Sequence, residues 1–263
     1  MYAGLEILTS QPSPELRSRV PHHLVGFLSP SEKFDAAAFR QLARERISEI
    51  QSRGRRPILV GGSGMYLKAL THGIVELPDP DPALREEVRA LSHDESLRRL
   101  LALDPAAAEH IDLQNTRRIQ RVLEIALQTG KKSAELNQEW KQKEAPDYDG
   151  VLLLREREEL YDRIAATVHA MFAQGVVEEV RRLENPSLTA QMAIGLRDIQ
   201  ALLRGECTQA ECEEAMIKSS RRYAKRQLTW FRNQFTFNSV DLTGLRTTQE
   251  LLTIARQALG ATE

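Results

Sequence analysis

The feature that most limits the fold of this chain is a short apolar run followed by glycines. Residues 57–60 (Pro-Ile-Leu-Val) form a continuous apolar segment, which is typical of a buried strand in a parallel sheet. Residues 61–64 (Gly-Gly-Ser-Gly) predict a tight turn, and a helical stretch follows over residues 65–71. Upstream, Asp35 is placed to cap a helix from about residue 36 to residue 53. Helix, strand, glycine turn and helix in this order predict an α/β fold with a parallel sheet.

A second apolar run, residues 151–154 (Val-Leu-Leu-Leu), predicts another buried strand. Residues 2–34 are expected to be irregular, with a short strand at 22–28. Helices are expected from about residue 82 to 130, and at 134–143, 157–174, 176–183, 195–203 and 209–232. The proline-rich residues 78–82 form the junction between the α/β segment and the helical segment that follows it. We therefore expect an α/β core made of residues 1–78 and 148–263, with a helical domain inserted at residues 79–147.

Charge and cysteine content exclude several classes of protein. The 263 residues include 36 lysines and arginines against 37 aspartates and glutamates, a formal net charge of -1. Nucleic-acid binding must therefore come from local patches. Two cysteines, Cys207 and Cys212, exclude a disulfide scaffold and fit a reducing compartment. No apolar run is long enough to span a bilayer and the N-terminus lacks a signal-peptide pattern, so we expect a cytoplasmic protein that enters no membrane.

The sharpest chemical signal is a basic helix near the C-terminus. At about 100° per residue, its cationic side chains gather on one side of the helix; they are Lys218, Arg221, Arg222, Lys225, Arg226 and Arg232. Arginine offers paired contacts to phosphate oxygens and lysine a point charge, so this face suits a phosphate ligand. A solvated basic face, or one paired with acidic residues near Glu178, fits the same spacing.

A second basic cluster opens a helix of the inserted region. Arg117, Arg118 and Arg121 lie within five residues of each other, on a helix whose other side is apolar. Such a cluster can contact a nucleic-acid backbone or its bases. Pairing with Glu124 fits the spacing equally well.

The glycine loop is a third candidate site. Its backbone N–H groups can approach an anion at a helix N-terminus, and the Ser63 hydroxyl can bond a substrate. No Gly-Lys-Ser/Thr follows, so the loop is not a complete phosphate-binding loop. A tight turn with no ligand fits as well. No metal-ligating residue is predicted, because the histidines and cysteines lack ligand spacing.

Together these segments resemble one family, the tRNA dimethylallyltransferases, also called tRNA isopentenyltransferases. The matching stretches follow the family's order and extend from residue 2 to about residue 235. They are residues 2–7, 21–24, 34–40, 57–66 (Pro-Ile-Leu-Val-Gly-Gly-Ser-Gly-Met-Tyr), 81–85, 118–124 (Arg-Ile-Gln-Arg-Val-Leu-Glu), 193–195 and 221–232 (Arg-Arg-Tyr-Ala-Lys-Arg-Gln-Leu-Thr-Trp-Phe-Arg).

The resemblance implies a core like that of P-loop kinases, and transfer of a dimethylallyl group from dimethylallyl diphosphate to N6 of adenine 37 in tRNA. It implies Mg²⁺ at the diphosphate, a helical insertion that grips the anticodon stem-loop, and a flipped target base. Diphosphate contacts are implied for Arg221 and Lys225. Contacts with tRNA are implied for Ser63, Arg85, Arg117, Arg118, Gln120, Arg121 and Arg226. A monomer is expected, with Trp230 and Phe231 anchoring the basic helix.

The chain also departs from the family pattern. Members begin with a strand, a phosphate-binding loop ending in Gly-Lys-Thr/Ser, a helix, and a strand ending in Asp-Ser, whose Asp is the general base. None of these lies within the 263 residues, and the family's Asp aligns upstream of Met1. We therefore expect an N-terminally truncated sheet and no transferase activity for the chain as given. Smaller departures are Gln11 where Lys is usual and Leu196 where Tyr is usual, while Ser63 and Ser220 replace Thr.

Three interpretations remain open at this point. The first is a tRNA dimethylallyltransferase whose true start lies upstream of Met1. The second is a short form that binds tRNA without transferring a prenyl group. The third is a relative of the nucleotide kinases, against which the missing phosphate-binding loop counts.

Overall fold

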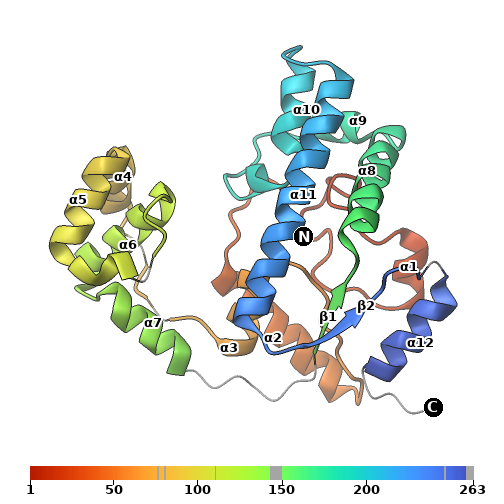
Figure 1. Ribbon diagram of the computed structural model, residues 1–263, viewed down its shortest axis with the longest axis horizontal. Coiled ribbons are helices and arrows are strands. Elements are labelled where there is room, and N and C mark those ends of the chain that lie inside the picture. Colours follow the sequence, from red (N-terminus) through yellow and green to blue (C-terminus); the bar gives the residue numbers. More distant parts are fainter. Residues whose placement is uncertain (76, 80, 110, 143–149, 246, 259–263) are drawn as a thin grey trace. The chain divides into compact units, whose positions relative to one another are not determined.

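A computed structural model of the protein describes residues 1–75, 77–79, 81–109, 111–142, 150–245 and 247–258 (Figure 1). It divides into two compact units, one made of residues 1–68 and 147–263 and the other of residues 69–146. Pro80, Lys143 and the predicted boundary near residues 147–148 lie outside the described residues. Each unit has its own hydrophobic core.

The first unit holds the sheet and the longest helix. Its elements are α1 (Pro14–Arg19), α2 (Ala36–Ser52), β1 (Val151–Leu154), α8 (Arg157–Ala173), α9 (Val176–Arg181), the 3-10 helix η2 (Ala190–Met192), α10 (Leu196–Leu203), α11 (Gln209–Gln234), β2 (Asn238–Asp241) and α12 (Thr248–Ala258), together with the start of α3 (Gly64–His72). Strands β1 and β2 pair in parallel, with Val151 opposite Asn238, and lie side by side in Figure 1. The predicted α/β class with a parallel sheet is confirmed.

The core of the first unit lies among α8, α9, α10 and α11. Its fully buried side chains include Leu5, Val168, Val176, Leu196, Ile199 and Met216. Helix α11 packs against α8 and α10, as Figure 1 also shows. The chain enters α10 through Gly195, whose φ is +87° and where a Cβ would lie 2.6 Å from the Met216 Cε. Both the positive φ and the close approach require glycine there.

The buried strand predicted at residues 57–60 was wrong. The segment is not a strand, and Ile58, Leu59 and Val60 are 72%, 46% and 87% exposed. A strand needs a hydrogen-bonded neighbour, and the described sheet joins β1 and β2 without this segment. Leu153 of β1 is also exposed, so that strand is less buried than predicted. The apolar pattern shows which side chains suit a sheet but not which neighbour is present.

Most predicted helices are confirmed to within two residues. The Asp35 side chain caps α2 as expected and accepts the N–H groups of Ala37 and Ala38. Four elements were missed, namely α1, η2, β2 and α12. In place of a strand at 22–28, Leu28 forms an isolated bridge with Tyr2.

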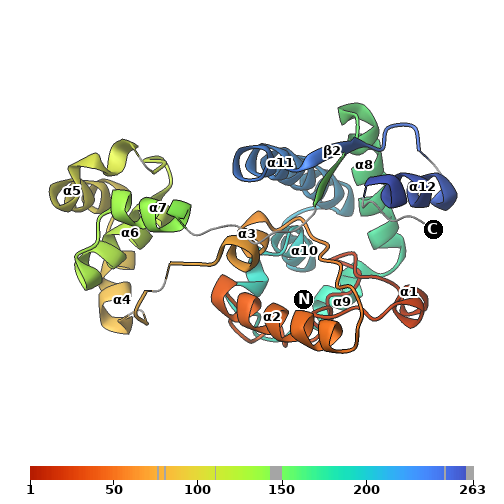
Figure 2. The same cartoon turned by 90° about the horizontal axis from the view of Figure 1, so that it is seen from below.

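The second unit consists of helices packed on one another (Figure 2). They are α4 (Pro82–Ala90), α5 (His93–Leu103), the 3-10 helix η1 (Pro105–Glu109), α6 (Thr116–Thr129) and α7 (Ser133–Gln142). Val88, Leu100, Ala107, Ile119 and Leu123 form its core.

Two aspartates fix helix ends in the second unit. Asp81 caps α4 ahead of Pro82, as predicted, and accepts the N–H groups of Ala83 and Leu84. The buried Asp104 accepts the backbone N–H of Ser133 at 2.7 Å and its hydroxyl at 2.5 Å. These bonds hold the start of α7 at the end of α5. Across both units, the described helices include none with the length and apolarity needed to cross a membrane.

Candidate functional site

A basic pocket lies on the second unit, between α4 and α6. Its volume is about 440 Å³. The described residues that line it are Arg85, Val88, Arg89, Asn115, Arg117, Arg118, Gln120, Arg121 and Glu124. Five of these side chains are arginines and one is a carboxylate. The pocket therefore carries an excess of positive charge.

The sequence of α6 dictates that its arginines face this pocket. The Asn115 side chain caps the helix by accepting the N–H of Arg118, and Gly130 ends it in the left-handed conformation. Ile119 and Leu123 lie one turn apart and are fully buried in the core. Because helical neighbours three or four residues apart share a face, Arg117, Arg118 and Arg121 lie away from this core-facing side of α6, where they line the pocket.

One carboxylate organises two of the pocket's arginines. Arg85 of α4 donates from Nε to the Glu124 Oε1 at 3.2 Å, and its Nη2 forms an ion pair with the same oxygen at 3.1 Å. Arg121 of α6 donates from Nη1 to the same oxygen at 2.7 Å. The pairing with Glu124 that the sequence left open therefore occurs, for Arg121 and also for Arg85. Gln120 lies beside them and donates from Nε2 to the backbone carbonyl of Leu91 at 3.1 Å, which ties α6 to the end of α4.

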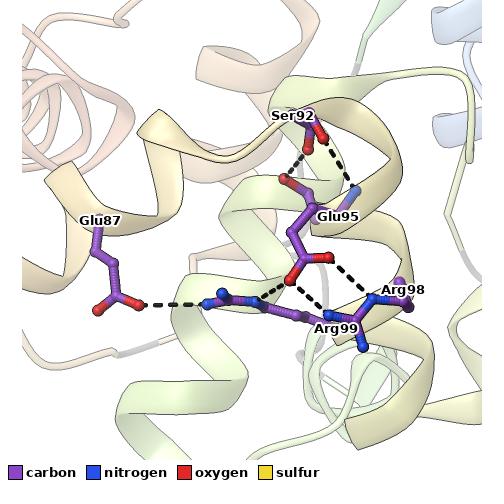
Figure 3. Close-up of polar contacts among 6 residues, drawn as sticks. Glu87, Ser92, Glu95, Arg98 and Arg99 are labelled. Carbon is purple, nitrogen blue, oxygen red and sulfur yellow. Dashed lines mark hydrogen bonds and ion pairs between the residues drawn. The ribbon is translucent and has the colours of Figure 1, made fainter.

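A different arginine cluster on the same unit shows ordinary charge pairing (Figure 3). Arg98 donates through two nitrogens to Glu95, at 2.9 and 2.7 Å. Arg99 donates to Glu95 at 2.6 Å and to Glu87 at 3.3 Å. Hydrogen bonds from Arg98 and Arg99 lower the pKa of Glu95. Two cations with two carboxylates leave little net charge, so this cluster offers no comparable anion site.

In the first unit, the glycine loop is pressed against α11. The Gly62 carbonyl accepts the Tyr223 hydroxyl at 3.3 Å and the Gln227 Nε2 at 2.8 Å. A Cβ at Gly64 would lie 2.1 Å from the Trp230 Cε3, so only glycine admits this approach. Ser63 is exposed, and its carbonyl accepts the Leu67 N–H at the start of α3. The loop thus presents the Ser63 side chain at a helix N-terminus.

The basic face of α11 holds the residues implied for the diphosphate. The Arg221 guanidinium lies 4.7 Å from the ring centroid of Tyr161 in α8. Its Nε is buried and has no hydrogen-bond partner among the described residues. Lys225, one turn further on, is exposed, and so is Arg226, whose guanidinium lies 5.7 Å from the Tyr223 ring.

The aromatic residues at the C-terminal end of α11 pack on one another, and Trp230 also packs on the glycine loop at Gly64. Phe231 is buried. The Trp230 ring lies 5.4 Å from that of Phe231 and 5.8 Å from that of Phe235. Sequence reasoning missed Tyr161, which accepts the Arg157 Nε at 3.2 Å and supports Arg221 from α8. The i, i+4 spacing of Arg157 and Tyr161 on a predicted helix was a signal for the first of these contacts.

The predicted site residues thus form two groups, one in each unit. Ser63, Arg221, Lys225 and Arg226 belong to the first unit, and Arg85, Arg117, Arg118, Gln120 and Arg121 to the second. No three histidine, cysteine or carboxylate side chains of the described residues converge as ligands of a metal ion would. Mg²⁺ stays a prediction from the resemblance.

Comparison with known proteins assigns this chain to a family. The model of the family described as IPP transferase matches residues 1–234. A tRNA dimethylallyltransferase of Geobacter sulfurreducens is 44% identical over 242 residues, which cover 88% of this chain and 78% of that protein. One of Anaeromyxobacter dehalogenans is 43% identical, covering 89% of this chain and 79% of that protein. The chain belongs to the IPP transferase family.

Solved structures agree on the fold. The full-length tRNA isopentenylpyrophosphate transferase of Bacillus halodurans has a TM-score of 0.68 and 34% identity, with 98% of this chain and 84% of that chain covered. A eukaryotic dimethylallyltransferase acting on tRNA has a TM-score of 0.81 over the whole of this chain and 71% of its own. At 24% identity, that second likeness shows the fold alone.

Proposed function

We propose that this protein acts as a tRNA dimethylallyltransferase, which moves the dimethylallyl group of dimethylallyl diphosphate to N6 of adenine 37. The observation that carries the proposal is the basic pocket, whose described lining includes five arginines and one carboxylate, in a chain of this family. Phosphate contacts dominate the affinity of proteins for nucleic acids. The proposal includes a monomer located in the cytoplasm, where tRNA is used.

The second unit supplies the grip on the anticodon stem-loop. Arg85, Arg117, Arg118 and Arg121 bind backbone phosphates, because a guanidinium matches two phosphate oxygens at once. Gln120 lies among them and completes the surface. In the first unit, Ser63 and Arg226 contact the tRNA near the target base.

Arg221 and Lys225 hold the diphosphate in this proposal. The N6 amine attacks the allylic carbon, a C–N bond forms, and the C–O bond to the diphosphate breaks with its electron pair. The leaving group gains charge only as that bond breaks, so cations aimed at it stabilise the transition state more than the substrate. The buried Nε of Arg221 and the Tyr161 ring beside it support a guanidinium held in one place. The N6 proton goes to a base that we assign to no described residue.

The test compares two matched double variants in tRNA binding. Fluorescence anisotropy with unmodified tRNA should show much weaker binding for Arg117→Ala/Arg118→Ala than for Arg98→Ala/Arg99→Ala, which removes the same charge from the same unit outside the pocket. Equal losses in the two variants would mean that only net charge matters and would refute the pocket as the binding surface.

The salt dependence adds a second readout. Replacing Arg85, Arg117, Arg118 and Arg121 together by alanine should reduce the slope of log K against log salt by up to about 3, since each phosphate contact on a single strand contributes about 0.7. A transfer assay with dimethylallyl diphosphate, Mg²⁺ and tRNA separates binding from catalysis. Conversion of adenine 37 would support the proposed transferase and contradict the inactivity expected from the sequence, whereas tRNA binding without conversion would support the short form that only binds tRNA.

A further inference from the structure

We propose that Glu124 is a positioning residue for RNA binding, which holds Arg85 and Arg121 in the orientation that receives phosphates. The inference rests on the proposed function and adds to it a residue that itself touches no RNA. The negative charge of the Glu124 carboxylate repels a phosphate in this pocket. If Glu124 favours RNA binding, it does so through the groups that it holds in place and not through its charge.

The contacts show what Glu124 contributes. Its oxygen Oε1 accepts one N–H from each of two guanidiniums, which come from two different helices, and forms an ion pair with a second nitrogen of Arg85 at 3.1 Å. The Glu124 side chain is 7% exposed, whereas those of Arg85 and Arg121 are 34% and 41% exposed. The carboxylate is therefore fixed at the floor of the pocket, and the two guanidiniums extend from it toward solvent. A guanidinium carries five N–H donors, so a bond through one edge sets its plane while another edge can meet phosphate.

Preorganisation accounts for a gain in affinity. An arginine that is disordered before binding loses its rotamer freedom when it meets RNA, which costs a factor of roughly two to ten in affinity for each side chain. When Glu124 already fixes the arginine in the folded protein, the rotamer freedom is lost during folding and RNA binding no longer carries that cost. Two arginines fixed in this way correspond to a gain of roughly four- to a hundredfold in tRNA affinity.

The sign of the effect distinguishes positioning from plain electrostatics. Glu124→Gln removes one negative charge from the pocket and changes the side-chain volume very little. If only charge matters, tRNA should bind more tightly to this variant. If Glu124 positions the arginines, tRNA should bind roughly tenfold more weakly, because a neutral amide oxygen holds two cations poorly.

The experiment measures tRNA dissociation constants by anisotropy on the full chain, with the melting temperature of every variant recorded alongside. Glu109→Gln serves as the matched control, since Glu109 is exposed in the same unit and outside the pocket. We expect weaker binding for Glu124→Gln and unchanged or slightly tighter binding for Glu109→Gln. In the Arg85→Ala/Arg121→Ala background, Glu124→Gln should cause no further loss, which a general loosening of the unit would not reproduce.

A second variant covers the case in which Glu124→Gln does not fold. Glu124→Asp keeps the charge but draws the carboxylate back by one methylene, so it cannot reach both arginines as before. Positioning predicts weaker binding for this variant too, and unchanged binding of a folded Glu124→Asp would overturn the inference. Equal or tighter binding by Glu124→Gln would also overturn it, while leaving the proposed function intact if the wild-type chain binds. If the wild-type chain binds no tRNA, the positioning role of Glu124 and the proposed function are both refuted.

Discussion

Replacing Gly64 by alanine should destabilise the first unit through a clash that only the structure reveals. The added Cβ would lie 2.1, 2.4 and 2.5 Å from three atoms of the Trp230 ring. Real Cβ atoms do not approach that closely, so the ring must move by more than an ångström. Trp230 cannot move freely, because its ring packs against Phe231 and Phe235.

Two opposing terms set the magnitude. Forcing an extra methyl group into a packed contact costs about 1–3 kcal/mol. Exchanging glycine for alanine in a helix contributes roughly 0.5–1 kcal/mol in the favourable direction, and less at Gly64 because it is the first residue of α3. The net loss should be about 1–2 kcal/mol. For a unit of this size that corresponds to a fall of about 2–8 °C in melting temperature.

Thermal unfolding followed by circular dichroism tests this prediction. Gly61→Ala is the matched control, since a Cβ there meets nothing within 4 Å and its φ is not positive. It should be neutral or slightly stabilising. The clash should also disappear when its partner is removed, so Gly64→Ala should cost almost nothing in a Trp230→Ala background. Additive losses in the double variant, or a wild-type melting temperature for Gly64→Ala, would refute the packing described for this loop.

Three further predictions concern single buried residues, namely Asp104, Gly195 and Cys212. Asp104→Ala should lower the stability of the second unit by about 1–3 kcal/mol, because the N–H and hydroxyl of Ser133 lose a buried acceptor; hydrogen exchange in α7 measures this. Gly195→Ala should cost more than about 1 kcal/mol in urea unfolding, since φ is +87° and the Met216 Cε lies 2.6 Å from the added Cβ. Burial raises the pKa of Cys212 from 9.0 to about 12, so the folded thiol should resist iodoacetamide at pH 8 until urea unfolds the chain. The folded state keeps a proton that the unfolded state loses above pH 9, so stability should fall between pH 9 and 12, and Cys212→Ala should lack that part of the decline.

Helices could be predicted because their signals are local. The Asp35 cap, the Asp81-Pro82 pair and Gly175 each act within a few residues of their own position, and each marks a helix boundary in the structure. Helix α12 carried such a signal as well. The Thr247 N–H and hydroxyl donate to Glu250, and the Glu250 N–H donates back to the Thr247 hydroxyl. A Thr-x-x-Glu sequence ahead of an apolar run is the signature of a capping box. The start of this helix could therefore have been predicted from the sequence.

Strands could not be predicted in the same way, because a strand is defined by its neighbour. Residues 57–60 have a more apolar sequence than Asn238–Asp241, yet the second segment pairs with β1 and the first remains exposed. No property of the four residues themselves distinguishes the two cases. Only the partner does, and the partner of β2 lies more than eighty residues earlier in the chain.

For the candidate site, the sequence located the arginines but treated ion pairing and ligand binding as rival explanations. The structure shows why they are not rivals. Around Arg98 and Arg99, two carboxylates match two cations, and the cluster is saturated. The described lining of the basic pocket has five arginines and one carboxylate, Glu124, which pairs with Arg85 and Arg121 through its Oε1. The number of carboxylates that face each basic cluster, including those from other helices, therefore decides whether charge remains for a ligand. That number depends on tertiary packing, since Arg85 reaches Glu124 from 39 positions away, and no spacing rule within one helix can supply it.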